Sequence, residues 1–287
     1  ITGGDGMLGT AFQEILKKYT ENVNTHSFGK QEFDVTNIDH VKKHTNLNPD
    51  IIIHCAAIVN ADYCEDNLEQ ATAVKINGMK NIIEMAKLCN AKIFFPQSFL
   101  VYDGKENPIT EKTKPNPLGT YGKLKYDSEL LLRQEMENSL VVRMAGFFGG
   151  KQKDKNFVGK IIPHMANLIK DGEKELNVGD RIWQPTYTND LAYNSLLLLA
   201  NDKNGVYCMS SHGEASFHEL TCEIVKILGI SNFDVNKVLA NSVAKDEKAK
   251  RPGKAIIENK RLQNEGLDRH RTWQESLEEY VNQEYFK

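Results

Sequence analysis

Tyr121 and Lys125 are the two residues whose types and spacing most directly suggest chemistry. They lie four positions apart in residues 120–125, which read Thr-Tyr-Gly-Lys-Leu-Lys, and this spacing places both side chains on one face of a helix. The pKa of a free phenol is about 10, and a neighbouring ammonium group lowers it by favouring the ionised form. A tyrosine tuned in this way can give a proton to a carbonyl oxygen. An ordinary exposed helical pair is the simplest alternative.

Ser98 is expected beside this pair. Residues 92–96 form an apolar run that predicts a strand covered on both faces of a parallel sheet. Ser98 then follows at the carboxyl edge of the sheet, where such sheets bind ligands. Its hydroxyl can hydrogen-bond the carbonyl oxygen that Tyr121 protonates, while Lys125 supports the phenol. The three side chains together predict proton-assisted chemistry at a carbonyl group.

A glycine-rich loop at the start of the chain predicts a dinucleotide cofactor. Residues 3–9 read Gly-Gly-Asp-Gly-Met-Leu-Gly, between a short apolar stretch and a helical pattern. Glycines in this position let a pyrophosphate approach the backbone at a helix N-terminus. A tight turn followed by a helix-packing glycine would give the same spacing without a ligand. The residues expected to contact the cofactor are Gly3, Gly6, Met7 and Leu8.

The end of the second expected strand bears on which dinucleotide binds. In NAD-binding folds an acidic residue there accepts the ribose 2′-hydroxyl, but residues 25–30 contain none, whereas Ser27 and Lys30 could hold a 2′-phosphate. We therefore expect NADP(H), with NAD(H) as the alternative. The nicotinamide would supply a hydride, and Lys125 could also reach its ribose.

Short apolar runs alternate with amphipathic helical patterns through the first half of the chain, as in βαβ units. This predicts an α/β fold, a Rossmann-type doubly wound parallel sheet, with a smaller mixed α/β substrate domain. We place the NADP-binding domain at residues 1–149 plus a returning segment at about 186–206, and the substrate domain at about 150–185 and 207–287. The expected strands are 51–56, 92–96 and 140–143, and the expected helices are 7–18, 68–89 and 121–136.

Composition excludes several other classes of protein. The 287 residues carry a net charge of −3, and the basic clusters are short and mixed with acids, which argues against nucleic-acid and membrane surfaces. Five cysteines without a CxxC pair, and eight histidines without ligand spacing, argue against a disulfide framework and a metal site. No apolar run reaches the ~20 residues of a membrane span. We expect a cytoplasmic protein that could form a homodimer, with residues missing before Ile1 because the chain opens inside a strand.

Several sequence blocks occur in the same order as in one known family. They are the loop at 3–9, Phe-Asp-Val-Thr at 33–36, Ala-Ala at 56–57 with Asp-Tyr-Cys-Glu at 62–65, Val-Tyr-Asp-Gly at 101–104, and Pro-Thr-Tyr-Thr-Asn-Asp-Leu-Ala at 185–192. On these blocks the chain resembles the dTDP-4-dehydrorhamnose reductase family, a nucleotide-sugar branch of the extended short-chain dehydrogenase/reductases. The resemblance implies NADPH-dependent reduction of the C4 ketone of a nucleotide-linked 4-keto-6-deoxy sugar, in rhamnose and surface polysaccharide biosynthesis.

Further site residues are expected around the catalytic set. For the cofactor, the resemblance implies Asp34 and Val35 near the adenine, Ala56 and Ala57 along the groove, and Asn77. For the substrate, the residues just before Pro185 include an arginine suited to a diphosphate and a tryptophan suited to a sugar or base. Packing at a domain interface is the alternative for them. The substrate candidates are Phe99, Arg181, Trp183, Gln184 and Arg251.

Departures from the family pattern keep the substrate open. Residues 98–100 read Ser-Phe-Leu where the family has Thr-Asp-Tyr, so an acid and a tyrosine beside the site are lost. One alternative function is a nucleotide-sugar epimerase or dehydratase that retains NAD. Another is a non-catalytic regulatory subunit similar to the beta subunit of methionine adenosyltransferase.

Overall fold

The computed structural model describes residues 1–150, 153–244 and 247–286. A parallel sheet lies at the centre of its larger part, in the order β1 (Ile51–Ile53), β2 (Lys92–Ser98), β3 (Ser139–Met144) and β8 (Gly205–Met209). Beyond β1, Thr2 forms parallel bridges to both His54 and Phe28. The chain therefore winds outwards in both directions from Thr2 and β1, as in a doubly wound sheet.

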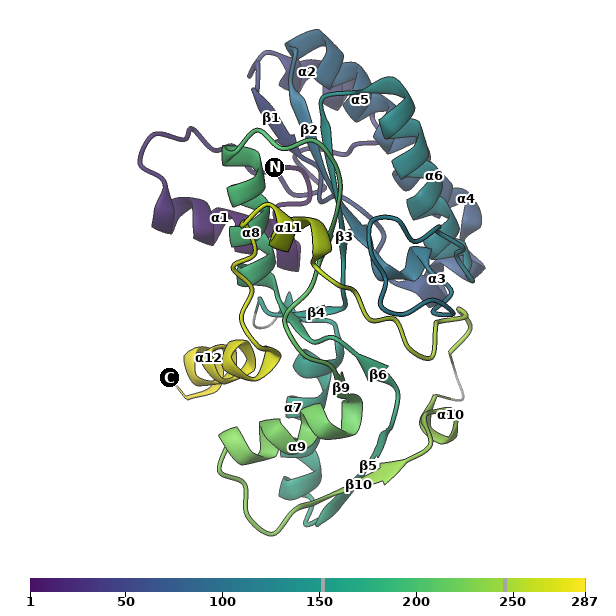
Figure 1. Cartoon of the computed structure of the whole chain (residues 1–287), viewed down its shortest axis with the longest axis vertical. Helices are drawn as coiled ribbons and strands as arrows, with labels where there is room; N and C mark the ends of the chain where they lie inside the picture. Colours follow the sequence, from purple (N-terminus) through teal and green to yellow (C-terminus); the bar gives the residue numbers. More distant parts are fainter. Residues whose placement is uncertain (151–152, 245–246, 287) are drawn as a thin grey trace.

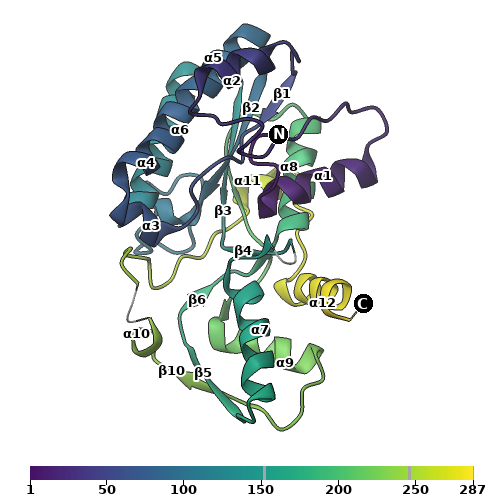
Figure 2. The same ribbon diagram turned by 180° about the vertical axis from the view of Figure 1, so that it is seen from behind.

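Helices cover both faces of this sheet, as Figures 1 and 2 show from opposite sides. One face carries α1 (Met7–Tyr19) and α8 (Thr188–Ala200), which pack against each other. The other face carries α2 (Ile38–Thr45), α5 (Gly78–Cys89) and α6 (Thr120–Glu135). Near-continuous apolar strands are what a sheet covered on both faces requires. The expected α/β fold with a parallel central sheet is confirmed.

A smaller part of the molecule lies at the carboxyl edge of the sheet, where β3 leads down into it (Figure 1). Short strands pair there two by two, and helices surround an aromatic core that includes Phe148, Tyr187 and Tyr280. The paired strands are β4 (Phe147–Phe148) with β7 (Thr186–Tyr187), β5 (Glu175–Gly179) with β10 (Asp234–Val238), and β6 (Ile182–Trp183) with β9 (Ala215–Ser216). The helices are α7 (Phe157–Lys170), α9 (Phe217–Ile227) and α12 (Trp273–Tyr285).

The long helix expected over residues 68–89 is present but interrupted. It consists of α4 (Leu68–Thr72), the π-helical turn η1 (Ala73–Asn77) and α5. A π turn changes which side chains face inwards, and such turns often mark functional sites. The remaining short elements are α3 (Ala61–Asp66), η2 (Phe99–Val101), α10 (Ala240–Val243) and α11 (Lys260–Asn264).

The returning segment is longer than expected. We placed its end at about residue 206, but β8 pairs with β3 as far as Met209 because Gly205–Met209 completes the parallel sheet. The α11 helix, from further along the chain, also packs on β8. The division into two domains itself stays a prediction.

Two absences hold for the residues that the structure describes. No helix among them is both long and apolar enough to cross a membrane. None of their His, Cys, Asp and Glu side chains form a group of three or more that could hold a metal ion. All five cysteines are free thiols.

Candidate active site

The glycine loop brings two backbone segments unusually close together. Gly3 has a φ of +65°, and a Cβ added there would lie only 2.7 Å from the backbone nitrogen of Ala56. Gly6 then turns back onto the Gly3 carbonyl and precedes α1, whose N-terminus has no side-chain cap. Uncapped N–H groups at a helix start are the donors that a pyrophosphate accepts. The loop and Ala56 thus form the floor of the expected cofactor groove.

Replacing Gly3 with Ala is expected to lower stability by about 2–4 kcal/mol, because backbone strain adds to an overpacked contact. Gly172 is a matched control, since its φ is +84° but a Cβ there would meet nothing within 4 Å. Gly172→Ala should cost only about 1 kcal/mol of backbone strain. Urea unfolding of the two cofactor-free variants measures the difference. Equal losses would contradict a crowded Gly3.

Helix α6 is positioned by contacts at its first turn. The Glu65 carboxylate on α3 accepts hydrogen bonds from the Thr120 backbone N–H at 2.8 Å and from its hydroxyl at 2.5 Å. Two residues later, Gly122 leaves room for the Leu100 carbonyl, which would lie 2.2 Å from an added Cβ. The start of α6 is therefore held directly against η2 and the end of β2.

This packing places Ser98 and Tyr121 together. The Ser98 hydroxyl lies near enough to the Tyr121 phenol to lower its pKa, and it accepts the Leu100 backbone N–H at 3.2 Å. Ser98 is the last residue of β2, at the carboxyl edge of the sheet as expected. A substrate oxygen placed between the two side chains would meet a hydroxyl and a phenol at once.

The expectation that a neighbouring ammonium group lowers the pKa of Tyr121 is wrong for the protein without ligands. Burial raises the pKa of Tyr121 to about 12, and the nearby Ser98 side chain only partly opposes this. Lys125 donates instead to the Pro96 carbonyl at 2.5 Å and lies 3.9 Å from the centroid of the Phe95 ring. Burial, together with the charge of Lys75, lowers the pKa of Lys125 to about 7. For the pKa values of both Tyr121 and Lys125, the effect of removal from water therefore outweighs any attraction between phenolate and ammonium.

A buried polar network supports Lys125 from below. Gln97 donates to the Lys125 backbone carbonyl at 2.8 Å and to the Glu129 carboxylate at 3.1 Å. Glu129, which is fully buried, also accepts two hydrogen bonds from Arg143 at 3.2 and 2.5 Å. Arg143 in turn donates to the Tyr102 hydroxyl at 2.8 Å. The network joins β2, α6 and β3 directly beneath the helix face that carries Tyr121 and Lys125.

Lys75 is a site residue that the sequence reasoning missed. Its side chain is 4% exposed, and its Nζ lies 4.7 Å from the centroid of the Tyr121 ring. Asn77, which we expected near the cofactor, is exposed instead. Asn77 precedes Gly78, whose Cα packs on Val35, and its predicted place near the cofactor stays a prediction. A lysine inside an apolar helical pattern was the available signal for Lys75.

The turn expected to bind a 2′-phosphate carries both signs of charge. Lys30 is exposed there, whereas the Ser27 hydroxyl is turned against Gly4 and has no hydrogen-bond partner among the described residues. The Glu32 carboxylate accepts the Gly29 backbone N–H at 3.0 Å, and the Asp5 carboxylate packs on the Gly29 Cα. The carboxylates of Asp5 and Glu32, which lie outside residues 25–30, thus stand at Gly29, next to Lys30.

The remaining cofactor candidates line the region between these features. Asp34 is partly exposed and accepts the backbone N–H and hydroxyl of Thr36 at 2.9 and 2.7 Å, while Val35 is a core residue. Ala57 is partly exposed beside Ala56. Met7 starts α1, and Leu8 is buried in the core under it. Only backbone atoms of Leu8 are therefore available to a ligand.

The two arginines proposed for the diphosphate are joined by one carboxylate. Arg181 donates two hydrogen bonds to Glu247, at 2.9 and 2.8 Å, and Arg251 lies 3.3 Å from the same carboxylate. Arg251 also makes a two-point contact with Asp62 on α3, at 3.2 and 2.8 Å. Both cations are thus paired with protein anions and face each other across Glu247.

Trp183 and Phe99 form an apolar wall of the same region. Both rings lie against Gly146, and Trp183 also contacts Phe217 at 5.2 Å between ring centroids. Trp183 is 9% exposed, and its indole N–H has no hydrogen-bond partner among the described residues. A packing role accounts for the ring, and the free N–H is consistent with the predicted substrate contact.

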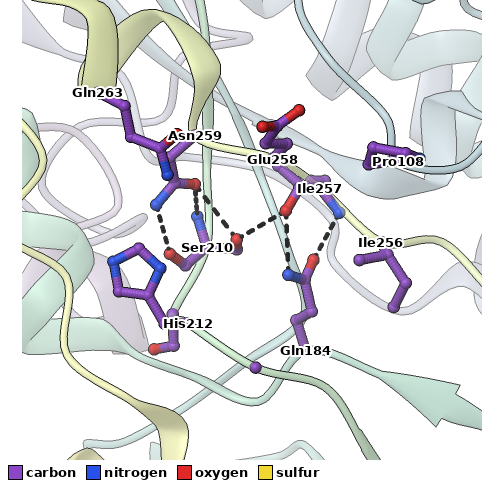
Figure 3. A pocket seen from close by; sticks show the side chains of 11 residues that line it. Pro108, Gln184, Ser210, His212, Ile256, Ile257, Glu258, Asn259 and Gln263 are labelled. Carbon is purple, nitrogen blue, oxygen red and sulfur yellow. Dashed lines mark hydrogen bonds between the residues drawn. The ribbon is translucent and has the colours of Figure 1, made fainter.

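Gln184 has a structural role, and its expected substrate contact stays a prediction. Its amide donates to the Ile257 carbonyl at 3.0 Å and accepts the Ile257 backbone N–H at 2.6 Å (Figure 3). The side chain is 5% exposed. Both polar ends of the amide are used to hold the segment around Ile257, because a buried amide must satisfy its hydrogen bonds.

Comparison with known proteins agrees with this geometry. Residues 1–286 match the RmlD substrate binding domain. The chain belongs to this family. The resemblance to dTDP-4-dehydrorhamnose reductases predicted from the sequence blocks is thereby confirmed.

Three similar proteins include two reductases and one regulatory subunit. The structure of a dTDP-4-dehydrorhamnose reductase from Clostridium acetobutylicum is 31% identical, with a TM-score of 0.89 over 98% of this chain and 97% of that one. The reductase from Bacillus anthracis in complex with NADP is 26% identical, with a TM-score of 0.87 over 98% and 97%. Methionine adenosyltransferase 2 subunit beta from Bos taurus is 24% identical over 93% of this chain and 82% of its own length.

Proposed function

We propose that this protein is a nicotinamide-dependent reductase of the C4 ketone of a nucleotide-activated 4-keto-6-deoxy sugar, most closely a dTDP-4-dehydrorhamnose reductase. The observation that carries the proposal is the proximity of Ser98, at the carboxyl edge of the sheet, to Tyr121, with Lys125 on the same helix. The residues present fit the cofactor, since the close approach of Gly3 to Ala56 and the uncapped α1 leave backbone donors for a pyrophosphate. Relatives named for this reaction support the same assignment.

The roles of the residues follow from their chemistry. The bound nicotinamide would supply the hydride. Ser98 would hold the ketone oxygen, and Tyr121 would give that oxygen its proton as charge develops there. Arg181 and Arg251 are the candidates for the diphosphate, which would replace Glu247 as their shared anion. Trp183 and Phe99 would cover the apolar face of the sugar.

The test of this function is a substrate panel. NADPH and NADH oxidation should be followed by absorbance with dTDP-, GDP-, UDP- and CDP-linked 4-keto-6-deoxy sugars. Turnover is expected with the panel, and it should be highest for one nucleotide class. No oxidation with any member of the panel would overturn the assignment. NAD that stays bound through purification, with no net oxidation, would instead indicate the epimerase or dehydratase alternative.

A regulatory subunit is the second candidate function. The similarity to methionine adenosyltransferase 2 subunit beta favours it, as does the apolar Phe99 beside Ser98 where the reductase pattern is polar. Against it, a scaffold has no physical need to keep Ser98, Tyr121 and Lys125 together. Stable association with a methionine adenosyltransferase catalytic subunit, measured by analytical ultracentrifugation, together with an inert substrate panel, would support this alternative.

We also propose a preference for NADP(H) that is set by opposing charges. Lys30→Met should weaken NADPH binding about tenfold or more and leave NADH nearly unchanged, because a charge-assisted contact to the 2′-phosphate is lost. Asp5→Asn should act in the opposite direction, strengthening NADPH several-fold relative to NADH, since a carboxylate repels the phosphate. Quenching of protein fluorescence by each dinucleotide measures both. Lys112→Met, an exposed lysine in the loop before α6, is the control.

Equal losses of NADPH and NADH affinity in Lys30→Met would contradict the phosphate contact. An unchanged ratio in Asp5→Asn would show that the carboxylate does not face the ribose.

A further inference from the structure

Lys75 occupies an unusual place for a lysine. It lies in the π turn η1, is 4% exposed, and points its Nζ at the face of the Tyr121 ring, 4.7 Å from the centroid. The ammonium donates to the Ile58 carbonyl at 2.5 Å and to the Cys64 sulfur at 3.5 Å. No carboxylate among the described residues pairs with it within salt-bridge distance. A buried cation without an anionic partner costs free energy, so it calls for an explanation.

The π turn is held against the catalytic helix. The Ser128 hydroxyl on α6 lies within hydrogen-bond distance of the carbonyls of both Lys75, at 2.9 Å, and Leu124, at 2.7 Å. This contact links the backbone of η1 to the helix that carries Tyr121 and Lys125. The position of Lys75 over the phenol is therefore built into the packing of the two helices.

We propose that Lys75 is a second active-site cation, which stabilises the phenolate of Tyr121 and makes Lys125 a better proton donor to it. The inference rests on the proposed reductase function. When the O–H bond of Tyr121 breaks and its proton forms an O–H bond on the substrate oxygen, the negative charge left on the phenol spreads into the ring. A cation over the ring face attracts that charge. Lys125 then gives the phenolate a proton, becomes a neutral amine and is reprotonated from solvent.

The surroundings of the three groups agree with this role. The charge of Lys75 lowers the pKa of Lys125, second only to burial, and burial raises the pKa of the Cys64 thiol, so this partner stays neutral at pH 7. Burial also lowers the pKa of Lys75 itself. The groups that face these side chains from the neighbouring elements are Cys64 and Ser98 around Tyr121, and His54, Cys55 and Glu129 around Lys125.

The deciding experiment is an NMR titration of protein labelled with ε-¹³C-lysine, without cofactor or substrate, in which Lys125→Arg assigns the Lys125 signal. In Lys75→Met the repulsion is gone, so the Lys125 midpoint should rise from about 7 by ~1 pH unit. The basic limb of the kcat profile should move in the same direction, because both the phenol and Lys125 hold their protons to higher pH. The value of kcat should fall about tenfold.

Two further variants separate charge from structure. Lys75→Arg keeps the cation and should keep the midpoint near that of the unchanged protein. Lys92→Met removes another buried lysine, 4% exposed and paired with Asp202 at the start of β2, and should lower stability without moving the Lys125 midpoint. Lys75→Gln replaces Lys75→Met if the latter does not fold.

A Lys125 midpoint that stays the same or falls when the charge at position 75 is removed overturns the proposal. Because the titration uses no substrate, it judges Lys75 even when no sugar is reduced. An inert substrate panel with the expected midpoint shift would count against the reductase function alone.

Discussion

Tyr121→Phe is expected to lower kcat for reduction of the 4-keto sugar by about 10²–10⁴, because the ring stays in place while the proton donor is lost. Stopped-flow or steady-state measurement of dinucleotide oxidation, followed by absorbance, gives the loss in kcat. The affinity for the dinucleotide itself, measured by fluorescence quenching, should change less than about twofold, since the phenol hydroxyl contributes little ground-state binding.

A matched control is available on the same helix. Tyr126 lies five residues further along α6 and packs partly buried beside Phe99 and Tyr102. Tyr126→Phe removes a hydroxyl from the same helix and should leave kcat within about twofold. If Tyr121→Phe kept near-normal turnover, another group would have to supply the proton and the role given to Tyr121 would fail.

Glu129→Gln is expected to lower the free energy of unfolding by about 3–5 kcal/mol, because it leaves the Arg143 guanidinium buried without its anion. The pair is 2.5 Å apart, and the two side chains are 3% and 0% exposed. Urea unfolding, with the midpoint and slope both recorded, measures the loss. Because Glu129 also holds Gln97 beneath Lys125, weaker activity should accompany it.

The exposed pair of Lys87 and Glu135 provides the comparison. Its side chains are 49% and 48% exposed at a distance of 2.6 Å. Glu135→Gln should cost less than about 1 kcal/mol, because solvent screens an exposed ion pair. Similar losses for Glu129→Gln and Glu135→Gln would mean that burial does not increase the cost of breaking the Glu129–Arg143 ion pair.

Local patterns in the sequence were enough for the larger part of the fold. The apolar runs at 51–56, 92–96 and 140–143 correspond to β1, β2 and β3, and the helical patterns at 7–18 and 121–136 correspond to α1 and α6. These elements are recognisable because strand and helix periodicity are properties of contiguous residues. The extent of β8 beyond residue 206 was not predicted, because the pairing of β8 with β3 joins segments more than sixty residues apart.

For the site, too, local motifs were predicted from the sequence and long-range contacts were not. The close backbone at Gly3 and the neighbouring Ser98 and Tyr121 follow motifs of a few residues, each at the end of a recognisable element. The pKa of Tyr121 was misjudged, because spacing along a helix says nothing about how much water the fold removes. The sequence also could not show that Gln184 pairs with Ile257, since the two residues lie 73 positions apart.

By itself the sequence determined the doubly wound α/β fold, the glycine loop and the Tyr121–Lys125 face, because each depends on the order of residues within one or two adjacent elements. Only the tertiary structure decided that Lys75 faces the Tyr121 ring, that Glu247 joins Arg181 to Arg251, and that Asp5 and Glu32 flank Gly29. Periodicity identifies the buried face of an element, whereas the partner of that face is chosen by packing between elements distant in the chain.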